Sequence, residues 1–172
     1  MTLTLSRIAI AAFGFCVSIA SALAQPAGPT LLGTFDVWEA YKTSDGRGAV
    51  CYAVTQPQTK EPATAKRDPI YFLITSWPKA NIANEPSIVI GYEFKQAATA
   101  TVQVGSDKFE FFTKADGAWL QEKAQEQRLI AALRGASEMT VKGFSKRGTL
   151  TTDTYSLKGI SAALDKIAEG CK

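Results

Sequence analysis

The first 24 residues constrain this chain most, because they have the pattern of a secretory signal peptide. A charged start that ends at Arg7 is followed by an apolar run over residues 8–20 and by Ala-Leu-Ala at positions 22–24, a small-x-small cleavage site in front of Gln25. The apolar run is shorter than the roughly 20 residues that a transmembrane helix needs. We therefore predict a signal peptide over residues 1–24 and a mature protein that is periplasmic or secreted.

Export decides how the cysteines are interpreted. Cys16 is removed with the leader, and Phe15 stands where a lipoprotein signal needs a small residue, so no lipid anchor is predicted there. Cys51 and Cys171 remain, in a compartment where thiols oxidise. We predict one structural disulfide between them. Closing a loop of about 120 residues stabilises a fold by roughly 4 to 5 kcal/mol on the chain-entropy model.

Length and charge favour one globular domain. Removal of 24 residues from 172 leaves 148, which suits a single domain. The Pro- and Gly-rich residues 25–32 are predicted to be a flexible N-terminal arm, and residues 33–172 the domain. Loss of Arg7 lowers the net charge from +3 to +2, and charges of like sign form no block. Neither nucleic acid nor a membrane surface is therefore expected as a partner.

The absence of histidine excludes most familiar catalytic and metal sites. Without imidazole the chain has no Ser-His-Asp or Cys-His catalysis and no zinc site that uses histidine. Cys51 and Cys171 are too far apart in sequence to form a zinc cluster or a redox C-x-x-C motif. No calcium loop and no phosphate-binding glycine pattern occurs, so we predict no metal and no cofactor.

The remaining candidates for catalysis are weak. The segment G-F-S-K-R-G at 143–148 differs in register from a nucleophile elbow. A dyad of Ser145 and Lys146 is also disfavoured, because adjacent side chains of a strand point to opposite faces. We predict a turn with a basic tip at residues 145–148. Isolated carboxylates are the other option, but no spacing brings two of them together as a glycosidase requires. These carboxylates are Glu93, Glu110, Asp116 and Asp153. We expect no enzymatic activity.

Short β-rich runs separated by turn residues dominate the chain. Two of them, at 70–77 and 88–94, are apolar on both faces, as central strands covered by a second layer would be. Many neighbours are joined by short turns, which favours an antiparallel two-layer or sandwich fold. The predicted strands occupy residues 35–41, 49–56, 70–77, 88–94, 99–104, 108–113, 139–144 and 149–155.

Two segments have helical periodicity. Leu129, Ile130 and Leu133 form a narrow apolar stripe on an otherwise polar run over residues 120–134, which predicts a short amphipathic helix. Residues 160–168 carry apolar side chains at helical spacing, and Cys171 continues that stripe. A C-terminal helix that directs Cys171 toward the sheet is therefore predicted.

The connection over residues 77–86 is the candidate for partner binding. It joins two apolar strands, is longer than a hairpin needs and has proline at positions 78 and 86, which would lower the entropy lost on binding. In the alternative interpretation, Trp77 and Ile82 fold back and seal one end of the sandwich. The candidate residues are Trp77, Lys79, Asn81, Ile82 and Asn84.

Two polar residues before the C-terminal helix are predicted to be structural. Asp153 and Ser156 lie where a strand passes into that helix, and short polar side chains there bond to free backbone N–H groups.

Several sequence blocks along the chain are distinctive in combination. They are V-C-Y-A-V-T-Q-P (50–57), I-G-Y-E-F (90–94), F-E-F-F-T (109–113), A-W (118–119) and S-K-R-G-T-L-T-T-D-T-Y-S-L-K-G-I-S-A-A-L (145–164), with Cys171 at the end. R-G-T followed by D-x-Y-S-L-K-G and a terminal cysteine is the most specific combination. Together these blocks resemble the invasion-associated locus B family.

The resemblance implies a fold and a setting but no catalytic residue. It implies an exported protein of Gram-negative bacteria and a mainly β, immunoglobulin-like antiparallel β-sandwich with one short amphipathic helix and a C-terminal helix. Some members carry a further cysteine shortly after the tryptophan that matches Trp38. Tyr41 and Lys42 stand there in this chain, so the resemblance implies a single disulfide.

The function expected is that of an exported, non-enzymatic interaction module of the bacterial envelope, linked to host-cell invasion or to envelope maintenance. Its partner would be a protein or an envelope component, and a monomer is favoured. The alternatives are a periplasmic sandwich that binds a small ligand and a hydrolase that works without histidine.

Overall fold

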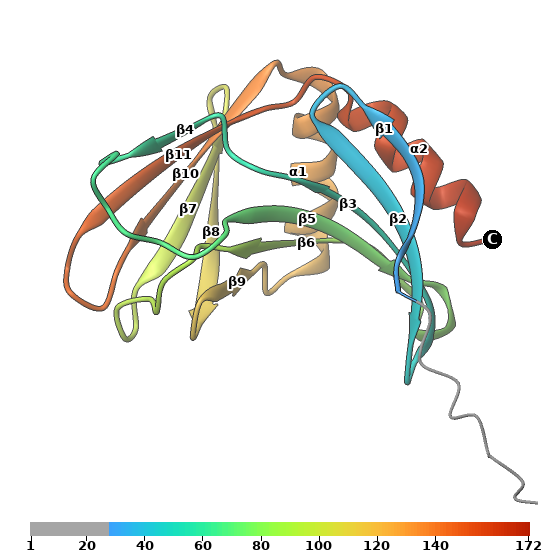
Figure 1. Ribbon diagram of the computed structural model, residues 1–172, viewed down its shortest axis with the longest axis horizontal. Coiled ribbons are helices and arrows are strands. Elements are labelled where there is room, and N and C mark those ends of the chain that lie inside the picture. Colours follow the sequence, from blue (N-terminus) through green and yellow to red (C-terminus); the bar gives the residue numbers. More distant parts are fainter. Residues whose placement is uncertain (1–27) are drawn as a thin grey trace, which may run out of the picture.

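The computed structural model describes residues 28–172 (Figure 1). The predicted signal peptide and residues 25–27 of the predicted arm lie outside this range. The strands are β1 (Thr30–Phe35), β2 (Trp38–Asp45), β3 (Gly48–Thr55), β4 (Thr59–Glu61), β5 (Tyr71–Trp77), β6 (Ile82–Val89), β7 (Thr99–Val104), β8 (Asp107–Lys114), β9 (Gly117–Trp119), β10 (Glu138–Phe144) and β11 (Leu150–Ser156). The helices are the 3-10 turn η1 (Pro78–Ala80) and the α-helices α1 (Lys123–Gly135) and α2 (Ile160–Gly170).

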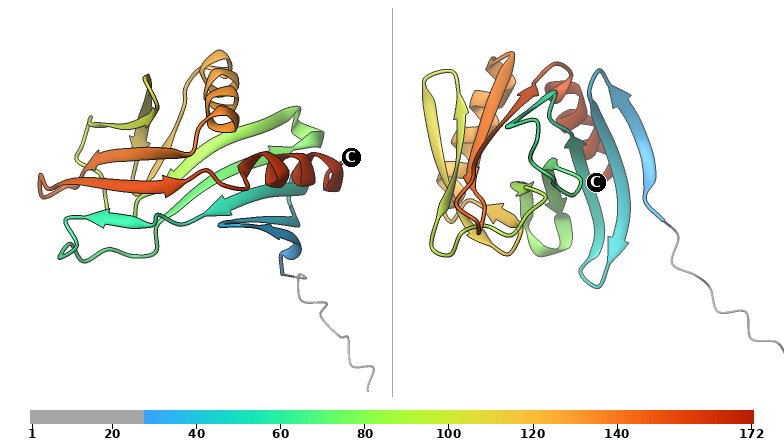
Figure 2. Two further views of the ribbon diagram at one scale, coloured as in Figure 1. Left: turned by 90° about the horizontal axis from the view of Figure 1, so that it is seen from above. Right: turned by 60° about the vertical axis from the view of Figure 1, so that its left-hand side comes forward.

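All strand pairs are antiparallel and join into one curled sheet. Its order is β1-β2-β3-β5-β6-β9-β8-β7-β10-β11-β4. The sheet bends so that the half containing β1, β2 and β3 faces the half containing β7, β10 and β11 (Figure 2). Edge-to-face ring contacts of Phe72 on β5 with Trp38 on β2 and with Tyr155 on β11 join the two halves across the interior. The predicted antiparallel β-sandwich class is thereby confirmed.

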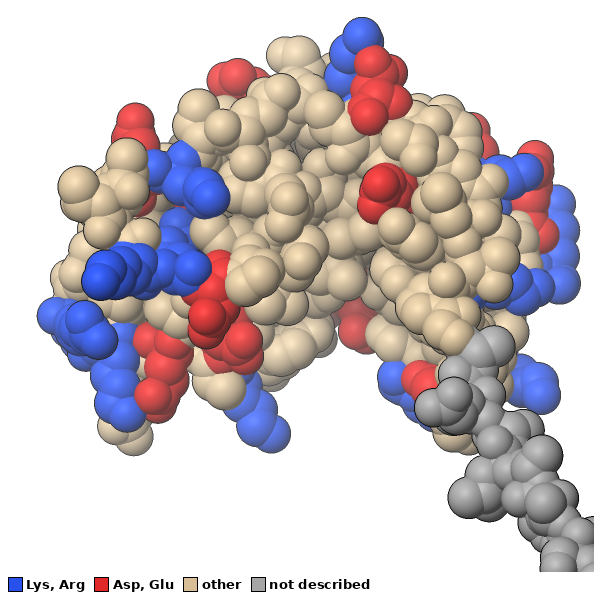
Figure 3. Space-filling model, viewed as in Figure 1, with Lys and Arg blue, Asp and Glu red and all other residues tan. Residues whose placement is uncertain are grey.

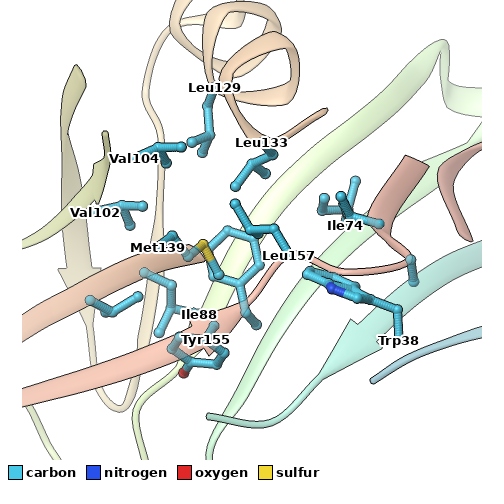
Figure 4. Close-up of a cluster of buried hydrophobic side chains, with 14 of the residues drawn as sticks. Trp38, Ile74, Ile88, Val102, Val104, Leu129, Leu133, Met139, Tyr155 and Leu157 are labelled. Carbon is cyan, nitrogen blue, oxygen red and sulfur yellow. The ribbon is translucent and has the colours of Figure 1, made fainter. Parts of the chain in front are cut away.

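The core fills the space inside this curl (Figure 4). Alternate residues of β7, beginning with Ala100 and Val102, are buried, as the alternating pattern of this strand predicted. Buried side chains of both halves and both α-helices belong to one hydrophobic cluster. Burial of such a cluster is the main favourable contribution to folding. The largest fully buried side chains include Trp38, Phe72, Phe109, Phe111, Met139 and Tyr155.

Both predicted helices are present and cover the inner face of the sheet. Helix α1 inserts Leu129 and Leu133 among the side chains of Val104 and Met139, while its polar residues face outward (Figure 4). Helix α2 packs on β1, β2 and β3 and buries Ile160 with three further apolar residues of the same stripe. None of the helices within residues 28–172 has the length and apolar character needed to cross a bilayer.

The structure corrects several details of the predicted element pattern. A turn at Asp36 and Val37 divides the predicted strand 35–41 between β1 and β2, the predicted strand 88–94 lies earlier in the chain as β6, and β9 was not predicted. Residues 30–32 were predicted as part of the arm but belong to β1. Leu32 packs against the end of α2, so closely that a Cβ added at Gly170 would lie 2.7 Å from Leu32 Cδ1. The polar connection after β3 contains the short edge strand β4, which pairs with β11. Strands β5 and β6 are covered on one face only, since Leu73 and Val89 are half-buried on the outside of the curl.

Candidate functional site

The predicted disulfide joins Cys51 of β3 to Cys171 at the end of α2. Their Cα atoms are 5.9 Å apart, and the two positions are separated by 120 residues. Both cysteines are buried within the hydrophobic cluster. The bond therefore fastens α2 to the sheet and presents no sulfur for exchange chemistry.

The predicted partner-binding loop is not a loop over most of its length. After Trp77, the turn η1 occupies Pro78–Ala80, and β6 begins at Ile82, which pairs with Trp77 across the hairpin. Left-handed backbone at Asn81 and Asn84 accommodates the tight turn and the bulge that follows it. The connection looked longer in the sequence than it is, because most of the first residues of β6 lack the β-branched side chains typical of a strand and because this part of β6 includes the bulge.

The five candidate residues of this hairpin divide into two groups. The Trp77 indole N–H donates to Asp45 Oδ2 at 2.9 Å, and the Arg47 guanidinium lies 4.1 Å above the ring, so Trp77 is fixed to the β2–β3 turn. The Asn84 backbone N–H donates to Ser76 Oγ at 3.0 Å, and Ile82 is half-buried. Lys79 and Asn81 are exposed. A partner role for this hairpin stays a prediction that would rest on those two residues.

Ser156 has the predicted structural role, whereas Asp153 has a different one. The Ser156 hydroxyl accepts the backbone N–H of Lys158 at 3.2 Å, just before α2. Asp153 lies earlier on β11, is fully buried and bonds to a side chain that is 86 residues away in the sequence. The predicted bond to a free backbone donor is therefore wrong for Asp153.

The partner of Asp153 is Arg67, and the two form a buried ion pair. Arg67 Nη1 and Nη2 each donate to one Asp153 carboxylate oxygen at 2.6 Å. Arg67 Nε and Nη2 also donate to the Ile90 carbonyl at 3.0 and 2.7 Å. The Arg67 side chain is 5% exposed and that of Asp153 0%. This pair is therefore part of the interior and not a surface contact.

A pocket of about 430 Å³ opens beside Arg67. We call it the tip pocket, because one wall is the tip of the β10–β11 hairpin, residues 145–151. Residues of the segment 62–67 form a second wall, and Tyr92 and Glu93 also line the pocket. Arg67 is 5.0 Å from the Tyr92 ring centroid, and the Tyr92 hydroxyl is 2.8 Å from Thr151 Oγ1. These contacts fix the inner end of the pocket.

The hairpin tip is held in place by its neighbours. Phe94 and Ser145 form a β-bridge, and the Lys146 backbone N–H donates to the Glu93 carbonyl at 2.8 Å. Lys146 Nζ donates to the Glu93 carboxylate at 2.9 Å. The Ser145 hydroxyl accepts the backbone N–H of Thr149 at 3.1 Å. Ser145 and Lys146 thus bond to separate partners and do not form a nucleophile with its base.

The charges of the tip pocket are mostly positive. Lys66, Arg67, Lys146 and Arg147 line it, against the single carboxylate of Glu93. Lys and Arg side chains gather on this side of the molecule (left in Figure 3) with a few acidic residues among them. Burial is the largest influence on Tyr92 and raises the pKa of its hydroxyl, so this group stays neutral at physiological pH.

Three of the four carboxylates considered for catalysis are paired with cations. Glu93 bonds to Lys146, Glu110 to Lys108 and Asp153 to Arg67. Asp116 contributes a backbone carbonyl, which accepts the Ile90 N–H at 2.9 Å. Cations thus neutralise three of these four carboxylates.

Sequence reasoning missed most of the tip pocket. Arg67 and Lys66 lie between the predicted strands 49–56 and 70–77, where no element was predicted, and Tyr92 lies within the predicted strand 88–94. Arg67 is 86 residues from Asp153, so no local spacing connects them. The one available signal was the basic turn at 145–148, which the structure confirms as a turn.

Comparison with known proteins identifies the family. The model of the invasion associated locus B (IalB) protein family matches residues 38–168. The chain belongs to this family. An IalB-like fold also appears in a solved structure, invasion associated protein B from Bartonella henselae, with a TM-score of 0.55 and 14% identity over 80% of this chain and 95% of that one. No curated protein sequence is significantly similar to this chain.

Proposed function

We propose that this IalB-family chain is an exported, non-enzymatic interaction module, and that the tip pocket is its binding site. The observation that carries the proposal is how the polar groups of the pocket are bonded. Arg67 donates to Asp153 and Ile90, Ser145 accepts from Thr149, and Lys146 donates to Glu93. The pocket thus offers fixed charges and hydroxyls, without a base in contact with a nucleophile, which suits binding better than catalysis.

Export is the second part of the proposal. A buried disulfide is typical of proteins that mature outside the reducing cytosol. Together with the leader pattern at residues 1–24, it supports a periplasmic or secreted location. Fractionation of the producing bacterium followed by N-terminal sequencing tests this. A mature chain that starts at Gln25 would support the proposal, and an uncleaved cytosolic chain would contradict it.

Affinity capture from envelope extracts and host-cell surfaces is used to find the partner. The parent protein and the tip-pocket variant Lys66→Gln/Arg147→Gln are each immobilised as bait, and the proteins that they retain are compared. A partner retained by the parent and lost by the variant supports binding at the tip pocket. The same preparations are assayed with ester, peptide and glycoside substrates. Turnover that Ser145→Ala abolishes would overturn the non-enzymatic assignment.

A small-ligand carrier remains the second candidate, because the volume of the tip pocket lies within the range of small-molecule sites. Native mass spectrometry of the protein purified from its own host separates the two functions. A mass increment that Lys66→Gln/Arg147→Gln removes would favour the carrier.

A further inference from the structure

The tip pocket combines two uncommitted cations with several hydroxyl groups. Lys66 and Arg147 are exposed and form no ion pair with any residue in 28–172, whereas Lys146 is neutralised by Glu93. Serine and threonine side chains of the hairpin and the Tyr92 hydroxyl add neutral hydrogen-bonding groups. Such a set of donors around excess positive charge is suited to a group with several acceptor oxygens.

Arg67 also lines the pocket, with its side chain 5% exposed. Four hydrogen bonds to Asp153 and Ile90 hold its guanidinium rigidly. A guanidinium has five N–H groups, so one on Nη1 is left over after these bonds. Because the ion pair already fixes the side chain, a ligand that accepts this N–H would cost little further ordering.

We infer that the tip pocket binds a phosphate or carboxylate group carried by the partner. This inference rests on the proposed binding function and names the chemistry that the site recognises. Lys66 and Arg147 supply the attraction from the two walls, and the hairpin hydroxyls supply hydrogen bonds. Glu93 does not oppose the anion, since Lys146 compensates its charge at 2.9 Å.

The test is a titration of the ¹⁵N-labelled full mature protein with inorganic phosphate, at constant ionic strength maintained with chloride. Amide signals of the two pocket walls are expected to shift together and to saturate. In Lys66→Gln/Arg147→Gln the apparent Kd should rise at least about tenfold, as expected when two charge-assisted hydrogen bonds are lost. Both residues are exposed and unpaired, so the melting temperature should stay unchanged.

The matched control is Lys108→Gln/Arg128→Gln, which removes the same two charge types from β8 and α1. This control should bind phosphate as the parent does. Equal affinity of the parent and both variants, or shifts spread over all surface cations, would overturn the inference.

Two further probes distinguish the source of the anion. A hexaglutamate peptide represents an acidic protein segment, and vesicles of phosphatidylglycerol, with phosphatidylcholine vesicles as reference, represent a lipid headgroup. Binding of either that the pocket variant loses supports the inference and names the source. If the captured partner is retained equally by the parent and the pocket variant, the binding function stands and the anion pocket is wrong.

Discussion

At the residue scale, the Arg67–Asp153 pair is the most demanding feature of the interior. Two buried charges lose their hydration, and only the bidentate contact and the bonds to Ile90 offset that loss. Removal of one partner would leave the other charge buried without compensation. The pair joins the connection after β4 to β11, so it also determines where one wall of the tip pocket lies.

Asp153→Asn should therefore lower the free energy of unfolding by about 3 to 5 kcal/mol, because Arg67 is left unpaired. Urea denaturation monitored by tryptophan fluorescence measures the change. Glu93→Gln is the control, since it breaks an exposed ion pair with Lys146 and should cost less than about 1 kcal/mol. Similar losses in both variants would refute the distinction between the buried and the exposed pair.

Two buried or half-buried tyrosines provide the second prediction. The Tyr155 hydroxyl is buried without a hydrogen-bond partner among residues 28–172, whereas that of Tyr92 bonds to Thr151. Tyr155→Phe removes an unpaired hydroxyl, so the free energy of unfolding should stay the same or rise by up to about 1 kcal/mol. Tyr92→Phe removes a hydrogen bond, so the free energy of unfolding should fall by about 1 kcal/mol. Thermal unfolding of the two variants compares them, and the reverse order would contradict the assignment of partners.

At the scale of elements, the spacing of apolar residues predicted which side chains are buried. It failed for strands that form only by pairing with a strand distant in sequence. The alternation of β7 and the stripe of α2 were readable because their apolar positions follow one inner face. Strand β4 could not be predicted in this way, since Thr59, Lys60 and Glu61 are all exposed. They form a strand only because they pair with the edge of β11. Nor did any pattern mark the start of β6, where the backbone of Asn84 bulges.

The disulfide should matter most for α2. Cys51→Ala/Cys171→Ala should lower the free energy of unfolding by about 4 to 5 kcal/mol on the chain-entropy model, because a closure over 120 residues is removed from the unfolded chain. Denaturation without reductant measures this, and the parent in excess reductant should match the variant. A loss below about 1 kcal/mol would mean that the packing of α2 alone accounts for its position.

The contact of α1 with β6 should respond to pH. Burial, followed by the nearby Glu85 carboxylate, raises the pKa of Glu126. The folded state thus holds this proton more tightly than the unfolded state does. This contribution to stability is present at low pH and is lost as the pH rises through the raised pKa.

Glu126→Gln should therefore be more stable than the parent at pH 7, by less than about 1 kcal/mol. The difference should vanish below about pH 4, where the carboxyl is protonated in both states. Melting temperatures over this range check the prediction. Glu138→Gln, which removes an exposed carboxylate from β10, is the control. A gain that persists at low pH would refute the electrostatic cause.

At the scale of the whole molecule, the curled sheet brings together segments that are distant in sequence. Arg67, Tyr92 and Thr151 meet only because β4 crosses to the edge of β11 and because residues 92–95 run beside the hairpin tip. No spacing in the sequence encodes this meeting, which is why the fold class could be predicted and the site could not. The hairpin at residues 77–82 was the more conspicuous candidate, but it is largely fixed by its own contacts.

We propose that the protein acts by binding a partner at the tip pocket, and site-specific photo-cross-linking in the living bacterium tests this. A photoreactive phenylalanine analogue replaces Thr64, an exposed residue that lines the pocket, and replaces Lys123 on α1 as control. Light-dependent adducts are expected from position 64, fewer of them in the Lys66→Gln/Arg147→Gln background, and none from position 123. No adduct at position 64, or equal adducts from both positions, would contradict binding at the tip pocket.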